Sequence, residues 1–343
     1  MLKAYYKPYQ LTFTQPVLTS RGQMKVKNGY YLMLEQNGVT GVGECSFIEG
    51  LSADVLETYE DTLTAFCKTI EQGQPDLSLL HSHPSIRFGY DTALLDLQNG
   101  GNKILYPSAF TSGQTPIPIN GLVWMGNKDF MLQQIEQKLQ SGFKCIKVKV
   151  GAINFEEEIS LLQFIRQHFS PDVIEIRLDA NGAFTATDVA EKLERLAAFH
   201  VHSIEQPVKQ NQQALMQQVC AQSPIPVALD EELIGVPEHQ QAALLDTIKP
   251  AYIILKPSLL GGLHVSNSWI AAAESRGIKW WATSALESNI GLNAIAQWVF
   301  TKQPDMVQGL GTGGLYTNNV TSPLYINNGA LCYNPQQPWG QLI

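Results

Sequence analysis

The chain has 343 residues, of which 44% are hydrophobic and 16% charged, so it is long enough for two domains of ordinary globular composition. Its net charge of −8 argues against a nucleic-acid-binding protein, which would carry a basic surface to neutralise phosphates. Five scattered cysteines without a CxxC motif argue against a disulfide framework and a zinc site, and no apolar stretch of about 18 residues suggests a membrane span. We therefore expect a cytoplasmic protein that binds neither nucleic acid nor a membrane.

The first hundred residues predict a mixed α+β unit that begins with strands. The runs YYLMLEQ (30–36) and VTGVGEC (39–45) flank the pair Asn37-Gly38. This pair favours the positive φ angles that a two-residue turn needs. The three segments together predict a β-hairpin.

Two helices and a connection should follow the hairpin. Helical patterns cover about 52–70, with Ser52 as the N-cap, and about 84–97, which is followed by Asn-Gly-Gly. The segment 100–116 shows no such pattern, so we predict that it connects this unit to a second domain.

From residue 117 onward, short apolar strands alternate with helical patterns, which is typical of repeated βα units and a parallel sheet. The predicted strands are 117–124, 146–150, 173–179, 202–207, 226–232, 251–258, 279–285 and 305–311. Eight βα units are the number that a closed (β/α)8 barrel requires. The sequence therefore predicts such a barrel.

Two lysines interrupt the apolar strand IKVKV. Lys147 and Lys149 lie two residues apart, so their side chains share one face of the strand. A half-solvated strand would explain this alternation equally well from these residues alone. In a barrel, however, both faces are covered, and lysines near the carboxyl end of a strand point at the barrel mouth, where the sites of this fold lie.

Five charged residues occupy equivalent positions at successive strand ends. Taken singly, an acidic residue there is readily explained as a helix cap or a turn residue. The spacings of 30, 26, 25 and 26 residues, however, each match about one βα unit, so the five side chains should converge on one rim. These residues are Lys149, Asp179, Glu205, Asp230 and Lys256.

The charges of this set suggest a metal-assisted reaction. Three converging carboxylates would repel one another unless a cation neutralised them, and an all-oxygen set suits Mg²⁺, with Mn²⁺ as a substitute, better than Zn²⁺. The metal, the second ammonium of Lys147 and partial desolvation should each disfavour a protonated Lys149, so that Lys149 could act as a general base. Lys256 lies on the opposite flank, as a second acid/base or a fixed cation. Such a site could remove a proton α to a carboxylate and hold the resulting enediolate.

The motifs at the five strand ends resemble those of the muconate-lactonising subgroup of the enolase superfamily, in which a lysine base acts together with Mg²⁺. The resemblance covers nearly the full chain. It rests on KVK (147–149), DAN (179–181), IEQP (204–207), DEE (230–232) and LKPSLLGG (255–262).

This resemblance implies an α/β fold with a C-terminal (β/α)8 TIM-type barrel and an N-terminal α+β capping domain. The capping domain would span residues 1–112, the barrel 113–314, and a C-terminal segment that returns to the cap 315–343. Cap loops around Ser20 to Lys27 and Phe47 to Leu51 would close over the barrel mouth and contact the substrate.

Within the subgroup, the segments 41–52, 120–126, 284–298 and 308–315 are similar to the o-succinylbenzoate synthases of menaquinone biosynthesis. The implied activity is a Mg²⁺-dependent syn-dehydration of 2-succinyl-6-hydroxy-2,4-cyclohexadiene-1-carboxylate to 2-succinylbenzoate, so the enzyme would be a hydro-lyase. By this resemblance Lys149 removes the proton and then assists departure of the hydroxide. Lys256 stabilises the enediolate from the other side.

Further residues are candidates for the substrate pocket or for support of the site. Asn181 and Glu231 could orient the metal ligands, although Asn181-Gly182 could equally be only a turn. Lys147 belongs to the same supporting set, because it should help to keep Lys149 ready to accept a proton. Backbone N–H groups in the glycine-rich stretch after the eighth strand could approach a carboxylate, with a tight turn as the equal alternative. The candidates there and after the seventh strand are Ser284, Leu286, Gly311 and Thr312.

The residues leave other functions open. An N-succinylamino acid racemase or a dipeptide epimerase would use Lys149 and Lys256 as two opposed acid/bases, but the Asp-x-Asp pattern associated with dipeptides is absent from GLGTGGL (309–315). A non-catalytic barrel that binds a carboxylate is a third interpretation. A Schiff-base aldolase would have no use for the three carboxylates. The expected partner is a small carboxylate, and a homo-oligomer stays open.

Overall fold

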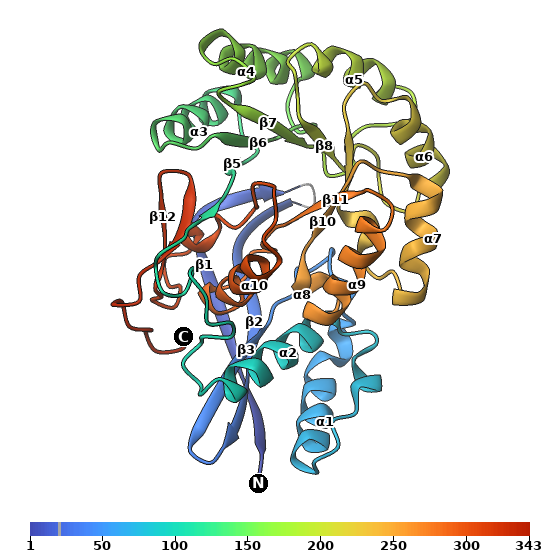
Figure 1. The fold of residues 1–343 in the computed structure, drawn as a ribbon. Coiled ribbons are helices and arrows are strands. Elements are labelled where there is room, and N and C mark those ends of the chain that lie inside the picture. Colours follow the sequence, from blue (N-terminus) through green and yellow to red (C-terminus); the bar gives the residue numbers. More distant parts are fainter. Residues whose placement is uncertain (20–21) are drawn as a thin grey trace.

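The computed structural model describes residues 1–19 and 22–343, without the side chains of residues 18 and 19. The N-terminal domain is a three-stranded antiparallel sheet in the order β1-β2-β3, covered by two helices (Figure 1). These elements are β1 (Lys3–Thr19), β2 (Gly22–Gln36), β3 (Val39–Cys45), α1 (Tyr59–Glu71) and α2 (Pro84–Gln98). The predicted α+β unit is confirmed.

The predicted hairpin joins β2 to β3. Gln36 pairs with Val39, and Asn37 and Gly38 form the turn with φ angles of 54° and 80°. Both angles are positive, as a two-residue type I′ turn requires. The Asn-Gly signal was therefore sufficient to locate the turn.

The predicted start of the first helix is wrong. Helix α1 begins at Tyr59, after a 3₁₀ helix η1 (Leu56–Thr58), and Ser52 is not its N-cap. The Ser52 hydroxyl instead accepts a hydrogen bond of 2.8 Å from the backbone N–H of Ile48. Local bonding of a serine to a nearby amide competes with helix capping, and here it closes a loop.

Helix α2 lies directly against β3 because both elements carry glycine at the crossing. A Cβ on Gly43 would stand 1.9 Å from the carbonyl oxygen of Gly89, and a Cβ on Gly89 would stand 2.3 Å from the sulfur of Cys45. Neither approach is compatible with a side chain. The two glycines therefore set the distance between helix and sheet in the capping domain.

A buried carboxylate holds the start of α2. Oδ1 of Asp54 accepts hydrogen bonds from the N–H of Ser85 (3.1 Å) and from its hydroxyl (2.7 Å), whereas Oδ2 has no partner among the described residues. Burial raises the pKa of Asp54 to about 7 from its usual 3.8, and the hydrogen bonds from Ser85 only partly oppose this. The folded protein thus favours the protonated acid.

We expect this group to make the protein less stable as the pH rises from 4 to above 7. Its pKa is higher in the folded than in the unfolded chain, so its stabilising contribution is complete below the unfolded pKa and is lost as the pH rises through about 7. In Asp54→Asn this loss, up to roughly 4 kcal/mol, should disappear. Urea unfolding of both proteins at pH 4.5, 6 and 8 measures the difference. Parallel stability profiles would contradict the assignment.

The second domain is a parallel βα barrel. Its seven-stranded sheet has the order β11-β10-β9-β8-β7-β6-β5, with helices around the outside (Figure 1). The strands are β5 (Gly121–Val123), β6 (Cys145–Lys149), β7 (Glu175–Asp179), β8 (Ser203–Glu205), β9 (Val227–Leu229), β10 (Tyr252–Leu255) and β11 (Lys279–Ala282).

Helices follow the barrel strands in chain order. They are α3 (Lys128–Gln140), α4 (Phe155–His168), α5 (Val189–Ala197), α6 (Gln213–Gln222), α7 (Glu238–Ile248), α8 (Pro257–Leu260), α9 (Gly262–Glu274) and α10 (Asn289–Lys302), with short 3₁₀ helices η2 (Leu77–Leu80), η3 (Glu231–Leu233) and η4 (Gly313–Leu315) elsewhere. Among the described residues, no helix combines the length and the apolar character needed to cross a membrane.

The first and eighth predicted strands are shorter than expected. The segment 117–124 divides into β4 (Ile117–Pro118), which pairs with β13 (Ala330–Tyr333), and β5 in the barrel. The eighth strand is reduced to two parallel bridges, from Gln308 to Ile119 and from Gly309 to Thr283. These bridges link both edges of the seven-stranded sheet and close the barrel.

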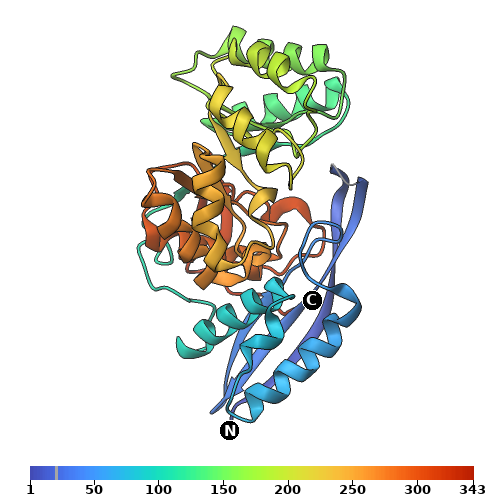
Figure 2. The same cartoon turned by 90° about the vertical axis from the view of Figure 1, so that its right-hand side faces the viewer.

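The C-terminal segment contacts both domains. Strands β12 (Leu324–Asn327) and β13 form a small sheet with β4, whereas the N–H of Thr317 donates to the carbonyl of Thr12 in β1 over 2.9 Å. Figure 2 shows the long β1–β2 hairpin, in blue, rising beside the barrel. The cap is therefore attached to the barrel by its own strands and by the end of the chain.

Candidate active site

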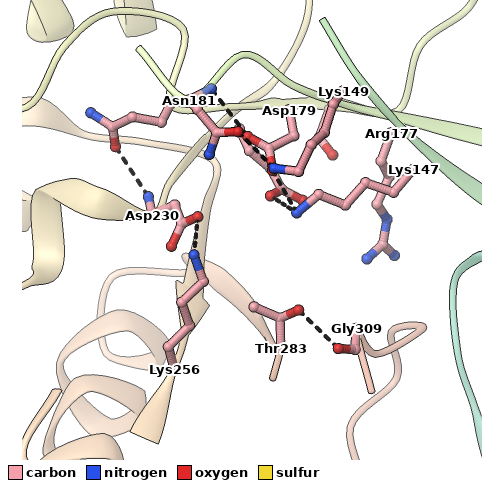
Figure 3. Close-up of polar contacts among 12 residues, drawn as sticks. Lys147, Lys149, Arg177, Asp179, Asn181, Asp230, Lys256, Thr283 and Gly309 are labelled. Carbon is pink, nitrogen blue, oxygen red and sulfur yellow. Dashed lines mark hydrogen bonds and ion pairs between the residues drawn. The ribbon is translucent and has the colours of Figure 1, made fainter. Parts of the chain in front are cut away.

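The five predicted residues lie at one rim because parallel pairing puts their strand ends at the same level. Lys149 is paired in register with Asp179, and Asp179 with Glu205. Asp230 and Lys256 directly follow β9 and β10. Figure 3 shows side chains from these successive strands pointing toward a common point. The predicted convergence is thus present in the structure.

Three of these side chains form a carboxylate triad, which we define as Asp179, Glu205 and Asp230. One oxygen of each lies within 4.8 Å of the others, and all three residues are at most 2% exposed. Oε1 of Glu205 and Oδ1 of Asp230 accept no hydrogen bond from any described residue. Buried carboxylate oxygens without donors fit a hard cation such as Mg²⁺.

Lys147 is paired with two members of the triad. Its Nζ lies 3.0 Å from Oδ2 of Asp179 and also contacts Glu205. Burial opposes the charge of Lys147, but Asp179, Glu205 and Asp230 together raise its pKa. Lys147 is therefore a buried cation that partly neutralises the triad, a contact that sequence spacing did not predict.

The triad remains crowded with negative charge. Burial raises the pKa of Glu205 to about 7, where Asp179 and Asp230 add to the effect and Lys147 opposes it. For Asp179, burial is outweighed by Lys147, Lys149 and Lys256, which lower its pKa. A divalent cation would remove the remaining repulsion, and this fits the donor set.

The two predicted acid/base lysines approach the triad from different sides. Nζ of Lys149 lies 2.9 Å from Oδ2 of Asp179, and Nζ of Lys256 lies 2.5 Å from Oδ2 of Asp230. In Figure 3, Lys256 reaches Asp230 from the side opposite to Lys149. A ligand between them would have one ammonium or amine group on each face.

Asn181 and Glu231 form a chain of hydrogen bonds along the rim that begins at Lys149. Asn181 accepts a hydrogen bond from Lys149 over 2.6 Å and donates to Oε1 of Glu231 over 2.9 Å. Its own N–H donates to Asp179, and its φ angle of 44° lies in the left-handed region. The two interpretations of Asn181, as a turn residue and as a functional one, are therefore compatible, because the turn aims its side chain at Lys149.

A cavity of about 500 Å³ extends from the rim to the capping domain. Its barrel side includes Lys147, Lys149, Asp179, Lys256 and Trp124. Its cap side is formed by residues 22–28 and by Phe47, Ile48, Glu49 and Leu51. Both predicted cap segments thus line the cavity where they are described, but residues 22–27 of the first belong to strand β2 and not to a loop. Positions 20 and 21 lie outside the described residues.

The predicted residues after the last two strands line this cavity as well. The hydroxyl of Thr312 donates to Oγ of Ser284 over 2.7 Å, and the N–H of Leu286 donates to the same oxygen over 3.1 Å. Leu286 has a φ of 65° and Gly311 also lines the cavity. All seven substrate or support candidates therefore lie at the rim or the cavity wall.

The structure adds two residues that the sequence did not single out. Trp124 places its ring 5.9 Å from Nζ of Lys149. Glu44 of the cap is fully buried and accepts hydrogen bonds from the N–H groups of Ser288 and Gly291, at the start of α10, and from Tyr9. This contact spans 244 positions of the chain, so no local signal could have predicted it.

Comparison with known proteins agrees with this geometry. A family model described as enolase C-terminal domain-like matches residues 131–338, and one described as MenC, N-terminal domain, matches residues 1–97. An o-succinylbenzoate synthase from Desulfotalea psychrophila is 46% identical, over 95% of this chain and 97% of that protein. One from Vibrio cholerae is 26% identical over 92% and 90%.

Solved structures agree on the fold. The crystal structure of MenC from Desulfotalea psychrophila matches with a TM-score of 0.87 and 43% identity, covering 96% of this chain and 99% of that one. The L-Ala-D/L-Glu epimerase from Bacillus subtilis has a TM-score of 0.83 over 99% of both chains, but at 18% identity it shows a shared fold alone. The family resemblance predicted from the motifs is confirmed: the chain belongs to the o-succinylbenzoate synthase family of the enolase superfamily.

Proposed function

We propose that the chain dehydrates 2-succinyl-6-hydroxy-2,4-cyclohexadiene-1-carboxylate to 2-succinylbenzoate, with Mg²⁺ at the carboxylate triad. The observation that carries the proposal is the 46% identity to an o-succinylbenzoate synthase over nearly the full chain. The rim supports it, because two lysines flank three buried carboxylates at the mouth of the cavity.

Lys149 is the proposed acid/base. It takes the proton from the ring carbon beside the carboxylate and then returns it to the hydroxyl that leaves from the same face, so that water departs and the ring becomes aromatic. Asn181, which accepts a hydrogen bond from Lys149, orients the lysine for this exchange. No other proton donor is needed, since the lysine gives back the proton that it took.

The other charged residues would hold the metal ion and stabilise the negative charge that develops on the substrate. Bound to Asp179, Glu205 and Asp230, Mg²⁺ would supply positive charge that stabilises the substrate carboxylate once the adjacent proton has gone. Lys256 adds a fixed cation on the opposite face of the substrate. Lys147 keeps two carboxylates of the triad in place through its ion pairs.

Incubation of the purified chain with Mg²⁺ and the cyclohexadiene carboxylate tests the proposal. Prompt appearance of the ultraviolet absorbance of 2-succinylbenzoate is expected, and chelation of the metal should stop it. Absence of product would contradict the proposal if the same preparation exchanged the α-protons of both enantiomers of an N-succinylamino acid in D₂O. Turnover of neither compound would favour a barrel that only binds a carboxylate.

The racemase alternative is favoured by one observation, the placement of Lys149 and Lys256 on opposite sides of the triad (Figure 3). Two opposed bases are what a racemase or epimerase requires. The solved epimerases, however, are 18% to 21% identical, and that likeness extends to the fold alone. We therefore treat racemisation as a second activity of the same site.

We further propose a cytoplasmic location and the three-part division predicted above, with boundaries near residues 112 and 314. All five cysteines are free, which fits a reducing compartment. The bridge between Phe13 and Tyr316 supports a C-terminal segment that returns to the cap. A small dicarboxylate is the proposed partner.

A further inference from the structure

Lys27 of the capping domain is a buried lysine at the wall of the cavity. It is 3% exposed, and its Nζ donates a hydrogen bond to the hydroxyl of Ser46, which is itself fully buried. An ammonium has three protons to donate. Within the described part of the chain, no carboxylate lies within 4.0 Å of Nζ. The charge is therefore buried without a direct ion pair.

The two nearest sources of negative charge are occupied by other donors. Glu44 accepts from Ser288, Gly291 and Tyr9, as described above. Glu287 accepts from the hydroxyls of Ser258 and Ser284 and from the N–H of Ala285. Each oxygen of both carboxylates thus has at least one partner, and neither carboxylate is directly paired with Lys27.

Burial lowers the pKa of Lys27, and the more distant Glu44 and Glu287 oppose this. An ammonium that is already desolvated in the free protein gains more from a ligand carboxylate than an exposed one does, because little water remains to be removed from it. The position of Lys27 therefore favours an anionic group in the cavity.

The other cations of the cavity are unsuited to a second carboxylate. Lys147, Lys149 and Lys256 are engaged by the triad. Lys25 is exposed, so water screens its charge. Among the described residues that line the cavity, this leaves Lys27, on the cap side, for a carboxylate that does not lie at the rim.

We propose that Lys27 binds the succinyl carboxylate of the substrate while the ring carboxylate lies at the triad. This inference rests on the proposed function and extends it, since it assigns the two carboxylates of one substrate to two ends of one cavity. It also makes Lys27 a determinant of specificity, because a substrate whose side chain lacks the second carboxylate would leave the buried ammonium without an anionic partner.

A thermodynamic cycle tests the inference. Calorimetry on the Mg²⁺-loaded full chain measures the affinity for 2-succinylbenzoate and for 2-butanoylbenzoate, in which a methyl group replaces the terminal carboxylate. The parent protein should bind the first ligand about 10- to 100-fold more tightly. In Lys27→Met this ratio should fall to about one, and in Lys27→Arg most of it should remain. The KM for the diene substrate should rise in Lys27→Met by a similar factor, with a smaller change in kcat.

Control variants distinguish a specific loss of ligand binding from a general loss of folded structure. Lys68→Met changes an exposed lysine of α1 in the same domain and should leave the ratio unchanged. If Lys27→Met does not fold, Lys27→Gln, which can still donate to Ser46, takes its place in the cycle. A parent protein that binds both ligands equally overturns the inference, as does a Lys27 variant that weakens both ligands by the same factor. A parent protein that binds neither and forms no product points to failure of the proposed function instead.

Discussion

Lys149→Ala should lower kcat for the dehydration by about 10³-fold or more, because it removes the group proposed to take and return the proton, which Asp179 and Asn181 hold in place. Mg²⁺ binding should persist, since all three carboxylates of the triad remain. The measurements, made on the parent protein and on the variant, are kcat with the cyclohexadiene carboxylate and the rise in Tm that Mg²⁺ causes. Added methylamine should restore part of the lost rate if the missing group is a base.

Lys144→Ala is the matched control for this variant. Lys144 is exposed and directly precedes β6, the strand that Lys149 ends, so its loss should leave kcat unchanged. Lys256→Ala should lower kcat as severely as Lys149→Ala, because it removes the fixed cation proposed on the opposite face of the substrate. Unchanged turnover in Lys149→Ala would remove the mechanism proposed above.

Glu205→Gln should abolish both the activity and the stabilisation by Mg²⁺. The substitution keeps the shape of a fully buried side chain but removes one of three charges from the triad. In the parent protein, metal at about 100 times its Kd should add about 2.7 kcal/mol to the free energy of unfolding. In the variant this increment should vanish, and kcat should fall by about 10³-fold or more. Calorimetric melting of both proteins with and without Mg²⁺ measures the increment in the free energy of unfolding.

The same variant also tests the pairing of Lys147. This lysine would retain Asp179, and burial and the neighbouring carboxylates disfavour the charge that Gln removes, so the metal-free variant should be at least as stable as the metal-free parent. Glu238→Gln, at the exposed start of α7, removes a carboxylate without touching the triad and serves as the control. An undiminished response to Mg²⁺ in Glu205→Gln would exclude the triad as the metal site.

The fold and the rim could be predicted because their signals are local and repeated. Each βα unit carries its own apolar strand and amphipathic helix, and the step of 25 to 30 residues between charged strand ends recurs four times. Parallel strands bring equivalent positions to one edge, so regular spacing in the sequence becomes proximity in space. The hairpin at Asn37-Gly38 was equally local, since the turn requires only its own two φ angles.

Other features depended on contacts that only the folded chain makes. Ser52 was predicted as the N-cap of the first helix, but its hydroxyl accepts a hydrogen bond from the N–H of Ile48 instead. The eighth strand is reduced to two bridges, and one of them brings Gly309 against Thr283, where a Cβ would stand 2.1 Å from a hydroxyl. Neither outcome is visible in the periodicity of the residues concerned.

By itself the sequence determined the architecture, the family motifs and the set of five charged residues at the strand ends, because repetition and residue type carry that information. Only the tertiary structure decided how the charges are balanced: Lys147 lies between Asp179 and Glu205, whereas Lys27 is buried beside the cavity and none of the described carboxylates forms an ion pair with it. The physical reason is that burial and pairing, not residue type, set the energy of a charge. Both arise from strands that meet only in the folded chain: β6, β7 and β8 around Lys147, and β2 beside the end of β3 around Lys27.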